Sequence, residues 1–153
     1  MTVAVRPSEP DDLEEILTLV RELAAYEHLE GAVAFDPEEF RRSLFGDRPV
    51  ASVLMAEVDN AVVGFALWFP SFSTFLGRPG IWLEDLFVRP AHRNIGAGTA
   101  LLSALRSMTD GRIEWAVLDW NETAIGFYER IGARPLDGWT TYRWALEPGP
   151  TAP

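Results

Sequence analysis

The chain of 153 residues contains no cysteine and only two histidines, His28 and His92. Without cysteine it forms no disulfide, no thiolate metal site and no cysteine nucleophile, and a reducing compartment is permitted. Two histidines are too few for a histidine-based zinc site, so we expect no metal. The first residues also lack the basic start and apolar core of a signal peptide, so we expect none. The longest apolar run, 61–70, is far short of the roughly 20 residues that span a bilayer, so we expect a cytoplasmic protein without membrane contact.

Basic residues are scarce as well. The 13 Lys and Arg residues face 23 Asp and Glu residues, which gives a net charge of −10. Nonspecific nucleic-acid binding requires a basic surface, so we expect no nucleic-acid partner. The acidic charge is compatible with a cationic substrate, although net charge by itself reports on solubility and association rather than on a site. Length and a hydrophobic content of 48% predict one domain at 1–147, and the Pro- and Gly-rich end predicts a flexible tail at 148–153.

Hydrophobic periodicity predicts elements in the order β, α, α, β, β, β, α, β, α, β. Helices are expected at about 9–26 after a Ser8 cap, and at 37–45, 96–108 and 122–130. Strands are expected at 2–6, 51–58, 61–69, 81–88, 113–118 and 139–146, with a hairpin turn at Asp59-Asn60 and a loop at 71–80. Hairpins together with one strand-helix-strand crossover predict an α/β (α+β) domain, with a mixed sheet and helices on both faces.

The most informative segment is Leu-Glu-Asp-Leu-Phe-Val-Arg-Pro-Ala-His-Arg-Asn-Ile-Gly-Ala-Gly at 83–98. A predicted strand ends at Val88, and a helix of small residues begins at about Gly96. The first turn of a helix has unpaired N–H groups, and glycine lets a phosphate approach the backbone. Arg93 adds a charged donor, so the segment predicts a pyrophosphate site. Walker and dinucleotide motifs do not fit, while a loop whose glycines serve only to turn the chain remains an alternative.

Arg93-x-x-Gly96-x-Gly98 after a strand resembles the acetyl-CoA loop of the GNAT superfamily. Three further stretches, 21–27, 83–88 and 120–133, resemble the diamine (spermidine/spermine) and thialysine N-acetyltransferase branch of that superfamily. The resemblance runs from about residue 3 to residue 146. It implies a GNAT fold, with a mostly antiparallel twisted sheet of six to seven strands and about four helices. It also implies acetyl-CoA as co-substrate, a small amine as acceptor and a homodimer, to which a final strand bearing Trp139, Tyr142 and Trp144 would contribute.

The same resemblance implies roles for individual residues. Backbone groups of Phe87 and Val88 should hold the pantetheine arm of coenzyme A. Asn121 should contact that arm, and Tyr128 should lie near the sulfur. The backbone amides that should wrap the pyrophosphate belong to Arg93, Asn94, Ile95, Gly96, Ala97, Gly98 and Thr99. Asn94 stands where many relatives have glycine, but asparagine tolerates left-handed geometry.

An amine with a pKa of about 10.4 must lose a proton before it attacks a thioester. Glu84 is the candidate base, and a polar strand residue in a salt bridge is the alternative. Strand alternation points Glu84 and Asp85 to opposite faces, so only one should face the site. The Val88 N–H is suited to stabilise the oxyanion, and Tyr128 to protonate the leaving thiolate, although a core aromatic is the alternative for Tyr128. We expect direct attack in a ternary complex, without an acyl-enzyme.

Acids and aromatics should position a cationic acceptor; the candidates are Tyr26, Glu27, Trp82, Glu84 and Asp85. In relatives that acetylate polyamines, the loop before Leu-Glu-Asp carries an acid and a tryptophan. Here the loop at 71–80 has no acid, has Phe75 near the tryptophan position and adds Arg78. A short diamine or a lysine-like amino acid is therefore expected to be a better acceptor than spermine. Acetylation of a peptide or protein amine, and a non-catalytic acyl-CoA binding module, are the alternatives.

Overall fold

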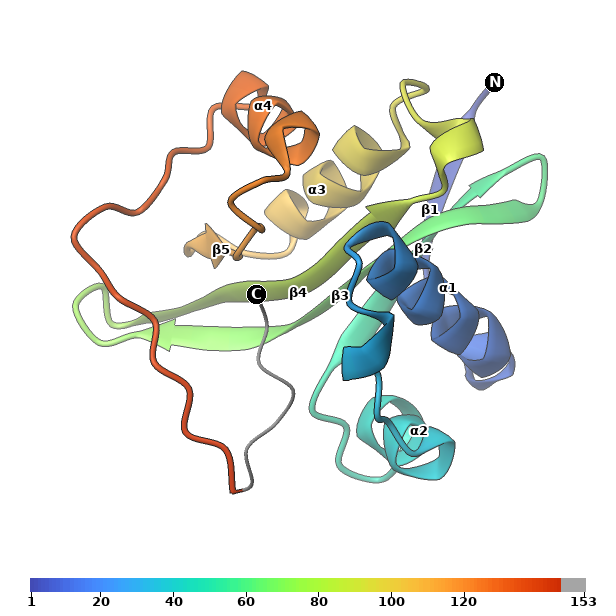
Figure 1. The fold of residues 1–153 in the computed structure, drawn as a ribbon, viewed down its shortest axis with the longest axis horizontal. Coiled ribbons are helices and arrows are strands. Elements are labelled where there is room, and N and C mark those ends of the chain that lie inside the picture. Colours follow the sequence, from blue (N-terminus) through green and yellow to red (C-terminus); the bar gives the residue numbers. More distant parts are fainter. Residues whose placement is uncertain (147–153) are drawn as a thin grey trace.

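The computed structural model describes residues 1–146, which form one sheet flanked by helices (Figure 1). The chain runs through β1 (Val3–Pro7), α1 (Leu13–Tyr26), α2 (Pro37–Phe45), β2 (Ser52–Val58), β3 (Ala61–Ser73), β4 (Arg78–Val88), α3 (Ala97–Ser107), β5 (Ile113–Glu114) and α4 (Glu122–Arg130). Short 3₁₀ turns at Pro10–Asp12, Glu30–Ala32 and Pro90–His92 precede α1, α2 and α3. The tail predicted at 148–153 lies outside the described residues.

The strands lie side by side in the order β1-β2-β3-β4-β5. The first four are antiparallel neighbours, whereas β5 runs parallel to β4 because α3 carries the chain back across the sheet. The expected mixed, mostly antiparallel sheet is therefore confirmed. The hairpin between β2 and β3 turns at Asp59 and Asn60, whose φ angles of 51° and 62° suit a two-residue turn.

Helices cover both faces of the sheet, as expected. On one face α3 packs against alternate residues of β2 such as Leu54 and Ala56, and Phe127 and Tyr128 of α4 adjoin this core. On the other face α1 and α2 pack against the intervening residues, which include Val53 and Met55. Because side chains alternate along a strand, two separate apolar layers form on one sheet.

The four predicted α-helices are present, with small changes at their starts. Asp36 caps α2 by accepting a hydrogen bond from the Glu38 N–H at 2.8 Å. Ser8 does not cap α1: its N–H donates to the Val53 carbonyl, and a 3₁₀ turn with Glu9 at its start intervenes. The local signals for helix formation were therefore sufficient, while one cap was assigned to the wrong residue.

Three expectations about strands were wrong. Residues 71–80 are not a loop, because β3 continues to Ser73 and pairs with a β4 that begins at Arg78. The strand expected at 113–118 is only Ile113–Glu114. Residues 139–146 are unpaired within the part of the chain that is described, so the sheet has five strands rather than six or seven. A strand requires a partner, and an alternating pattern alone does not supply one.

Arg89 fixes the chain at the point where β4 ends. Its guanidinium lies 2.8 Å from Glu15 and 2.9 Å from Glu22, both on α1, and it donates to the Val62 carbonyl at 2.8 Å. The junction between β4 and α3 is thereby held against α1, although the two segments are far apart in sequence. Sequence reasoning had given Arg89 only the role of ending the strand.

Replacing Arg89 with Met should destabilise the fold, because Glu15, Glu22 and the Val62 carbonyl lose their shared donor. We expect a loss of about 1–3 kcal/mol in the free energy of unfolding, measured by urea denaturation. The matched control is Arg41→Met, which breaks only an exposed pair with Glu38 on α2 and should have no measurable effect. Equal losses in the two variants would contradict the role given to Arg89.

Candidate active site

The junction between β4 and α3 presents a row of free backbone N–H groups. Asn94 and Gly96 have positive φ angles of 63° and 91°, which curl the chain before α3 begins. The first helical hydrogen bond is donated by Ala100 to the Gly96 carbonyl. Among the described residues, none accepts a hydrogen bond from the N–H groups of residues 94–99. We call residues 94–99 the amide arc; it has the character of an anion site at a helix N-terminus.

Gly96 and Gly98 serve different purposes in the arc. A Cβ on Gly96 would meet no atom within 4 Å, so that glycine is required by its φ angle and not by crowding. A Cβ on Gly98 would lie 3.3 Å from the ring of Phe127. Gly98 therefore allows the Phe127 ring of α4 to pack closely against the start of α3.

The side chain of Arg93 does not extend freely from the arc. Its Nε donates to the Val88 carbonyl at 2.9 Å, and its guanidinium lies over the Tyr26 ring at 4.4 Å from the centroid. The ring of Phe87 is 5.8 Å away. The expected charged donor to phosphate is thus engaged elsewhere, and it connects the loop to β4 and to the end of α1.

The backbone of Val88 faces the open edge of β4. The Arg89 N–H donates to Val63 on the β3 side, and successive N–H groups alternate in direction, so the Val88 N–H points away from β3. On that side β5 pairs only with Ile81 and Trp82 and then diverges. The edge of β4 near Val88 is therefore available for hydrogen bonding to an extended ligand.

The two adjacent acids on β4 are not placed by simple alternation. Leu67 pairs with Asp85 whereas Trp68 pairs with Leu83, so Glu84 is an extra residue in a bulge. Glu84 is exposed and accepts a hydrogen bond from Trp82 Nε1 at 2.8 Å. Asp85 is partly buried, and burial together with the charges of Glu84 and Glu27 raises its pKa to about 7. The expectation of two carboxylates on strictly opposite faces was wrong.

Glu27 and Tyr128 belong to the same neighbourhood. Burial raises the pKa of Glu27, and burial with the nearby Glu27 charge raises the pKa of Tyr128 to about 12. The Tyr128 phenol is therefore protonated at neutral pH. Its ring packs on Trp115, with centroids 4.8 Å apart. Because the charge of Glu27 acts on both Asp85 and Tyr128, the three groups share one region at the end of α1.

Asn121 and Trp120, at the start of α4, close this region on the side opposite the end of α1. The Asn121 side chain caps α4 by accepting a hydrogen bond from the Ala124 N–H at 3.2 Å. Trp120 packs against Tyr26 and His28 of the α1 end, with ring centroids 6.5 and 5.8 Å away. Sequence reasoning placed neither Trp120 nor His28 at the site and counted Trp120 among tryptophans expected mostly in the core or at an interface, although Trp120 directly precedes Asn121.

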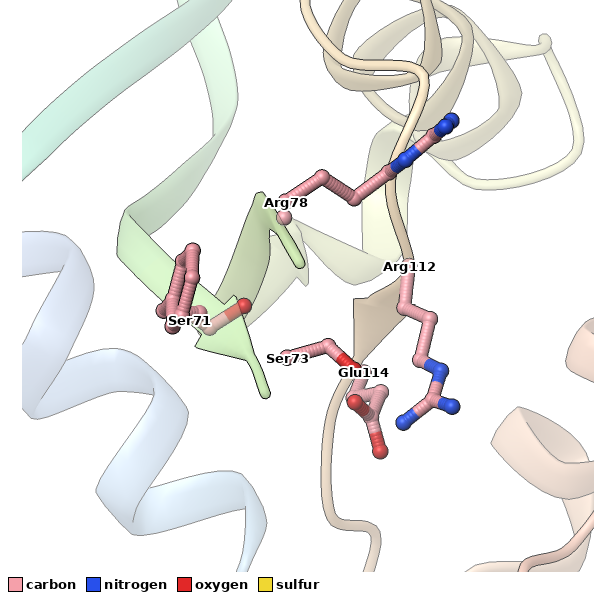
Figure 2. A pocket seen from close by; sticks show the side chains of 7 residues that line it. Ser71, Ser73, Arg78, Arg112 and Glu114 are labelled. Atoms are coloured by element: carbon pink, nitrogen blue, oxygen red, sulfur yellow. The ribbon is translucent and has the colours of Figure 1, made fainter. Parts of the chain in front are cut away.

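A separate cavity of about 70 Å³ lies between the β3–β4 hairpin and β5, and is lined by Ser71, Phe72, Ser73, Arg78, Gly80, Arg112 and Glu114. Figure 2 shows the Arg78 side chain directed away from Arg112 and Glu114. None of the predicted site residues lines this cavity. Within residues 1–146, no three potential metal ligands are grouped, and no helix is long and apolar enough to cross a membrane.

Comparison with known proteins gives a consistent result. Residues 13–133 match the acetyltransferase (GNAT) family. The chain is 35% identical to thialysine N-epsilon-acetyltransferase of Bos taurus, over 95% of this chain and 94% of that protein. It is 31% identical to spermidine/spermine N(1)-acetyltransferase-like protein 1 of Homo sapiens, over 94% of this chain and 22% of that protein. An integron cassette protein from V. cholerae has the same fold, with a TM-score of 0.77, 24% identity and coverage of 95% and 93%.

Replacing Asp85 with Asn should stabilise the protein in alkaline solution. A carboxyl whose pKa is raised from 3.8 to about 7 on folding contributes stability at low pH and loses it as the pH rises through 7. The melting temperature of Asp85→Asn should therefore exceed that of the original protein by several degrees at pH 9, and the difference should shrink toward pH 4. Glu30→Gln, at an exposed acid, is the control. A difference that does not change with pH would contradict the raised pKa.

Proposed function

The chain belongs to the GNAT acetyltransferase family, and on this premise we propose that it acetylates a primary amine of a small molecule by direct attack in a ternary complex. It is an acetyl-CoA-dependent N-acetyltransferase. The acceptor that we propose is a lysine-like amino acid or a short diamine. The observation that carries the proposal is the amide arc beside an open strand edge with partly buried acids next to it. The cytoplasmic location expected from the sequence remains a prediction.

The arc and the strand edge fit coenzyme A. Free N–H groups at 94–99 suit the pyrophosphate, and the unpaired edge of β4 at Phe87 and Val88 suits the amides of the pantetheine arm. Asn121 stands at the head of α4 beside this path. When bound, acetyl-CoA supplies the activated acetyl thioester. The Val88 N–H is free to donate a hydrogen bond to the carbonyl oxygen, as preorganised backbone donors do in acyl transfer.

Asp85 is the proton acceptor that we favour over Glu84. A general base works best when its pKa lies near the working pH, and the pKa of Asp85 is about 7. Glu84 is more exposed and holds the Trp82 indole, while its charge helps to raise the pKa of Asp85. In this proposal Asp85 takes a proton from the ammonium, directly or through water, and Glu84 keeps Asp85 basic enough to do so.

Tyr128 is the proposed proton donor to the departing sulfur. Its pKa of about 12 keeps the phenol protonated, and the departing thiolate takes up a proton at neutral pH because the pKa of a thiol is about 8.5. Packing of the ring on Trp115 fixes its direction. Proton transfer from a positioned phenol to the thiolate would balance the charge left on the sulfur when its bond to the acetyl carbon breaks.

The acids near the site support a compact cationic acceptor. Glu27, Glu84 and Asp85 lie close enough for the charges of the first two to raise the pKa of the third. The hairpin of β3 and β4, in contrast, has no acid between Ser71 and Gly80 and exposes Phe75 at its tip. A long polycation therefore gains no carboxylate there. The name of the Bos taurus relative, a thialysine acetyltransferase, supports a lysine-like acceptor.

A panel of amines tests this acceptor class. Lysine analogues and short diamines should give a higher kcat/KM than spermine, because the second cationic half of spermine finds no carboxylate on the hairpin. The measurement is release of free coenzyme A with a thiol reagent, and the chain contributes no background because it has no cysteine. A kcat/KM for spermine well above the others would overturn the acceptor assignment, and no turnover with any amine would overturn the proposed function.

Changing Tyr128 to Phe should lower kcat by about 100-fold or more, the usual contribution of a general acid. The dissociation constant for acetyl-CoA, measured by calorimetry, should change little, because the phenol acts on the sulfur only as it leaves. Tyr142→Phe is the matched control, since Tyr142 is 91% exposed and should keep full activity. An unchanged kcat in Tyr128→Phe would show that another group donates the proton.

A further inference from the structure

The cavity of about 70 Å³ beside the β3–β4 hairpin has a wall of charged residues on β5. Ile113 at the start of β5 and Trp115 just after it adjoin the core under α3. Because side chains alternate along a strand, Arg112 and Glu114 point to the other face of the sheet, which α1 and α2 cover. The charged wall of the cavity therefore lies on the face of the sheet that also carries the proposed acceptor site.

Arg112 and Glu114 are charges of opposite sign that do not pair with each other. Both line the cavity, and Figure 2 shows their side chains extending in the same direction from β5. Within residues 1–146 every ion pair involves Arg6, Arg41 or Arg89, so neither Arg112 nor Glu114 is engaged in one. The cavity thus offers a ligand one positive and one negative group.

Two serine hydroxyls face these charges from β3. Trp68 belongs to the core under α3, so Ser71 and Ser73 point to the opposite face, and both line the cavity. The Ser73 hydroxyl accepts a backbone hydrogen bond at 3.2 Å, which leaves its own proton free to donate. We call Ser71, Ser73, Arg112 and Glu114 the charged pocket. An arginine with hydroxyl donors suits a carboxylate, and a glutamate beside them suits an ammonium group.

We propose that the charged pocket binds the α-carboxylate and the α-ammonium of a lysine-like acceptor, and that it thereby selects an amino acid over a diamine. This inference rests on the proposed function and names the group that distinguishes its two acceptor classes. Arg112 and the serine hydroxyls would hold the carboxylate, and Glu114 would hold the α-ammonium. The side-chain ammonium would then extend along β4 to Asp85, where the proton is removed.

The spacing along β4 agrees with the length of a lysine side chain. Glu114 pairs with Trp82, and Asp85 follows Trp82 by three residues, with the bulge at Glu84 between them. Two to three residues of strand at about 3.3 Å each separate Glu114 from Asp85 by roughly 7–10 Å along the strand. In lysine, five single bonds of about 1.5 Å join the α-carbon to the terminal nitrogen. An extended lysine side chain therefore spans most of this distance, and the carboxylate side chains span the rest.

Trp82 lies between the charged pocket and Asp85. Its neighbours Ile81 and Leu83 belong to the core under α3, so the indole points to the face that α1 covers. There Nε1 donates a hydrogen bond to Glu84 at 2.8 Å, which fixes the ring. A methylene chain that packs on this ring would leave water. The head group, the methylenes and the terminal ammonium of lysine would thus each meet a group of matching chemistry.

Arg112 is the residue that would decide between the acceptors. A diamine brings a second ammonium group into the charged pocket, where Glu114 attracts it and Arg112 repels it, so the two effects oppose each other. An amino acid satisfies both residues at once. Spermine would place further ammonium groups beside Arg112, which agrees with its expected rank below lysine analogues.

The first test compares L-lysine with 1,5-diaminopentane, which is lysine without its carboxylate. In Arg112→Gln, kcat/KM for lysine should fall about 10- to 100-fold, the loss expected for a hydrogen bond between charged groups. The kcat/KM for 1,5-diaminopentane should stay the same or rise, because the repulsion is removed. Arg112→Lys should recover part of the loss, since it keeps the charge but not the planar fork. Glu114→Gln should lower kcat/KM for both amines.

Arg78→Gln is the matched control, because Arg78 adjoins the same cavity but is directed away from Arg112 and Glu114 (Figure 2). It should leave both values unchanged, and circular dichroism checks that each variant folds. Equal losses for the two amines in Arg112→Gln, or no loss with lysine, would overturn the inference. An original protein that prefers 1,5-diaminopentane to lysine would also overturn it, while the acetylation observed would still support the proposed function.

The second test measures binding without turnover. Calorimetry with coenzyme A present gives the dissociation constant of L-lysine for the original protein and for Arg112→Gln, and the constant should rise about 10- to 100-fold in the variant. The same rise in a protein that acetylates neither amine would leave the charged pocket intact and remove the proposed function. Equal dissociation constants would remove the charged pocket, even where acetylation of an amine continues.

Discussion

The site depends on the divergence of β5 from β4 after two paired residues. Ile81 and Trp82 of β4 face Ile113 and Glu114 of β5, and beyond them the two strands separate. The remaining edge of β4 keeps unpaired backbone groups, which in folded proteins normally bind a partner. The junction that follows, with its amide arc, continues the same line of free donors. One irregularity in the sheet thus leaves free both the strand edge and the row of amides that the proposed function assigns to coenzyme A.

The partly buried acids around this opening have no basic partner among the described residues. Arg89 is engaged by Glu15 and Glu22, and Arg93 by the Val88 carbonyl and the Tyr26 ring. A nearby cation would lower the pKa of Asp85, and no basic group acts on it; burial, Glu84 and Glu27 all raise it. Partly buried acids without a basic partner cost stability, which is common at functional sites. An ammonium group on the acceptor would supply the missing charge, so the electrostatic cost in the free protein becomes a preference for amines.

Local signals in the sequence predicted the helices and the free amides at the start of α3, because caps, glycines and a 3.6-residue period are read within a few residues. Asp36, Gly96 and Asn121 each act where the pattern indicated. The bulge at Glu84 was not predictable, since it arises from the register between β3 and β4. The engagement of Arg93 by Tyr26 depends on where α1 ends in space. The Gly and Pro residues at 71–80 led to the prediction of a loop. Glycine is nevertheless tolerated in a strand where the neighbouring backbone passes close, as at Gly80 beside Arg112.

The strand pattern at 139–146 shows what a local preference does not determine. Alternation of Tyr142, Trp144 and Leu146 expresses a local preference for a strand with one apolar face, but it does not specify which chain provides the neighbouring strand. Among the described residues, the segment 139–146 has no neighbouring strand, so this preference is not realised. Residues 113–118 show the same effect in part, since only Ile113 and Glu114 pair with β4. Because β5 stops there, the edge of β4 beyond Trp82 stays free, and the opening of the sheet follows from a strand that is shorter than its sequence pattern predicts.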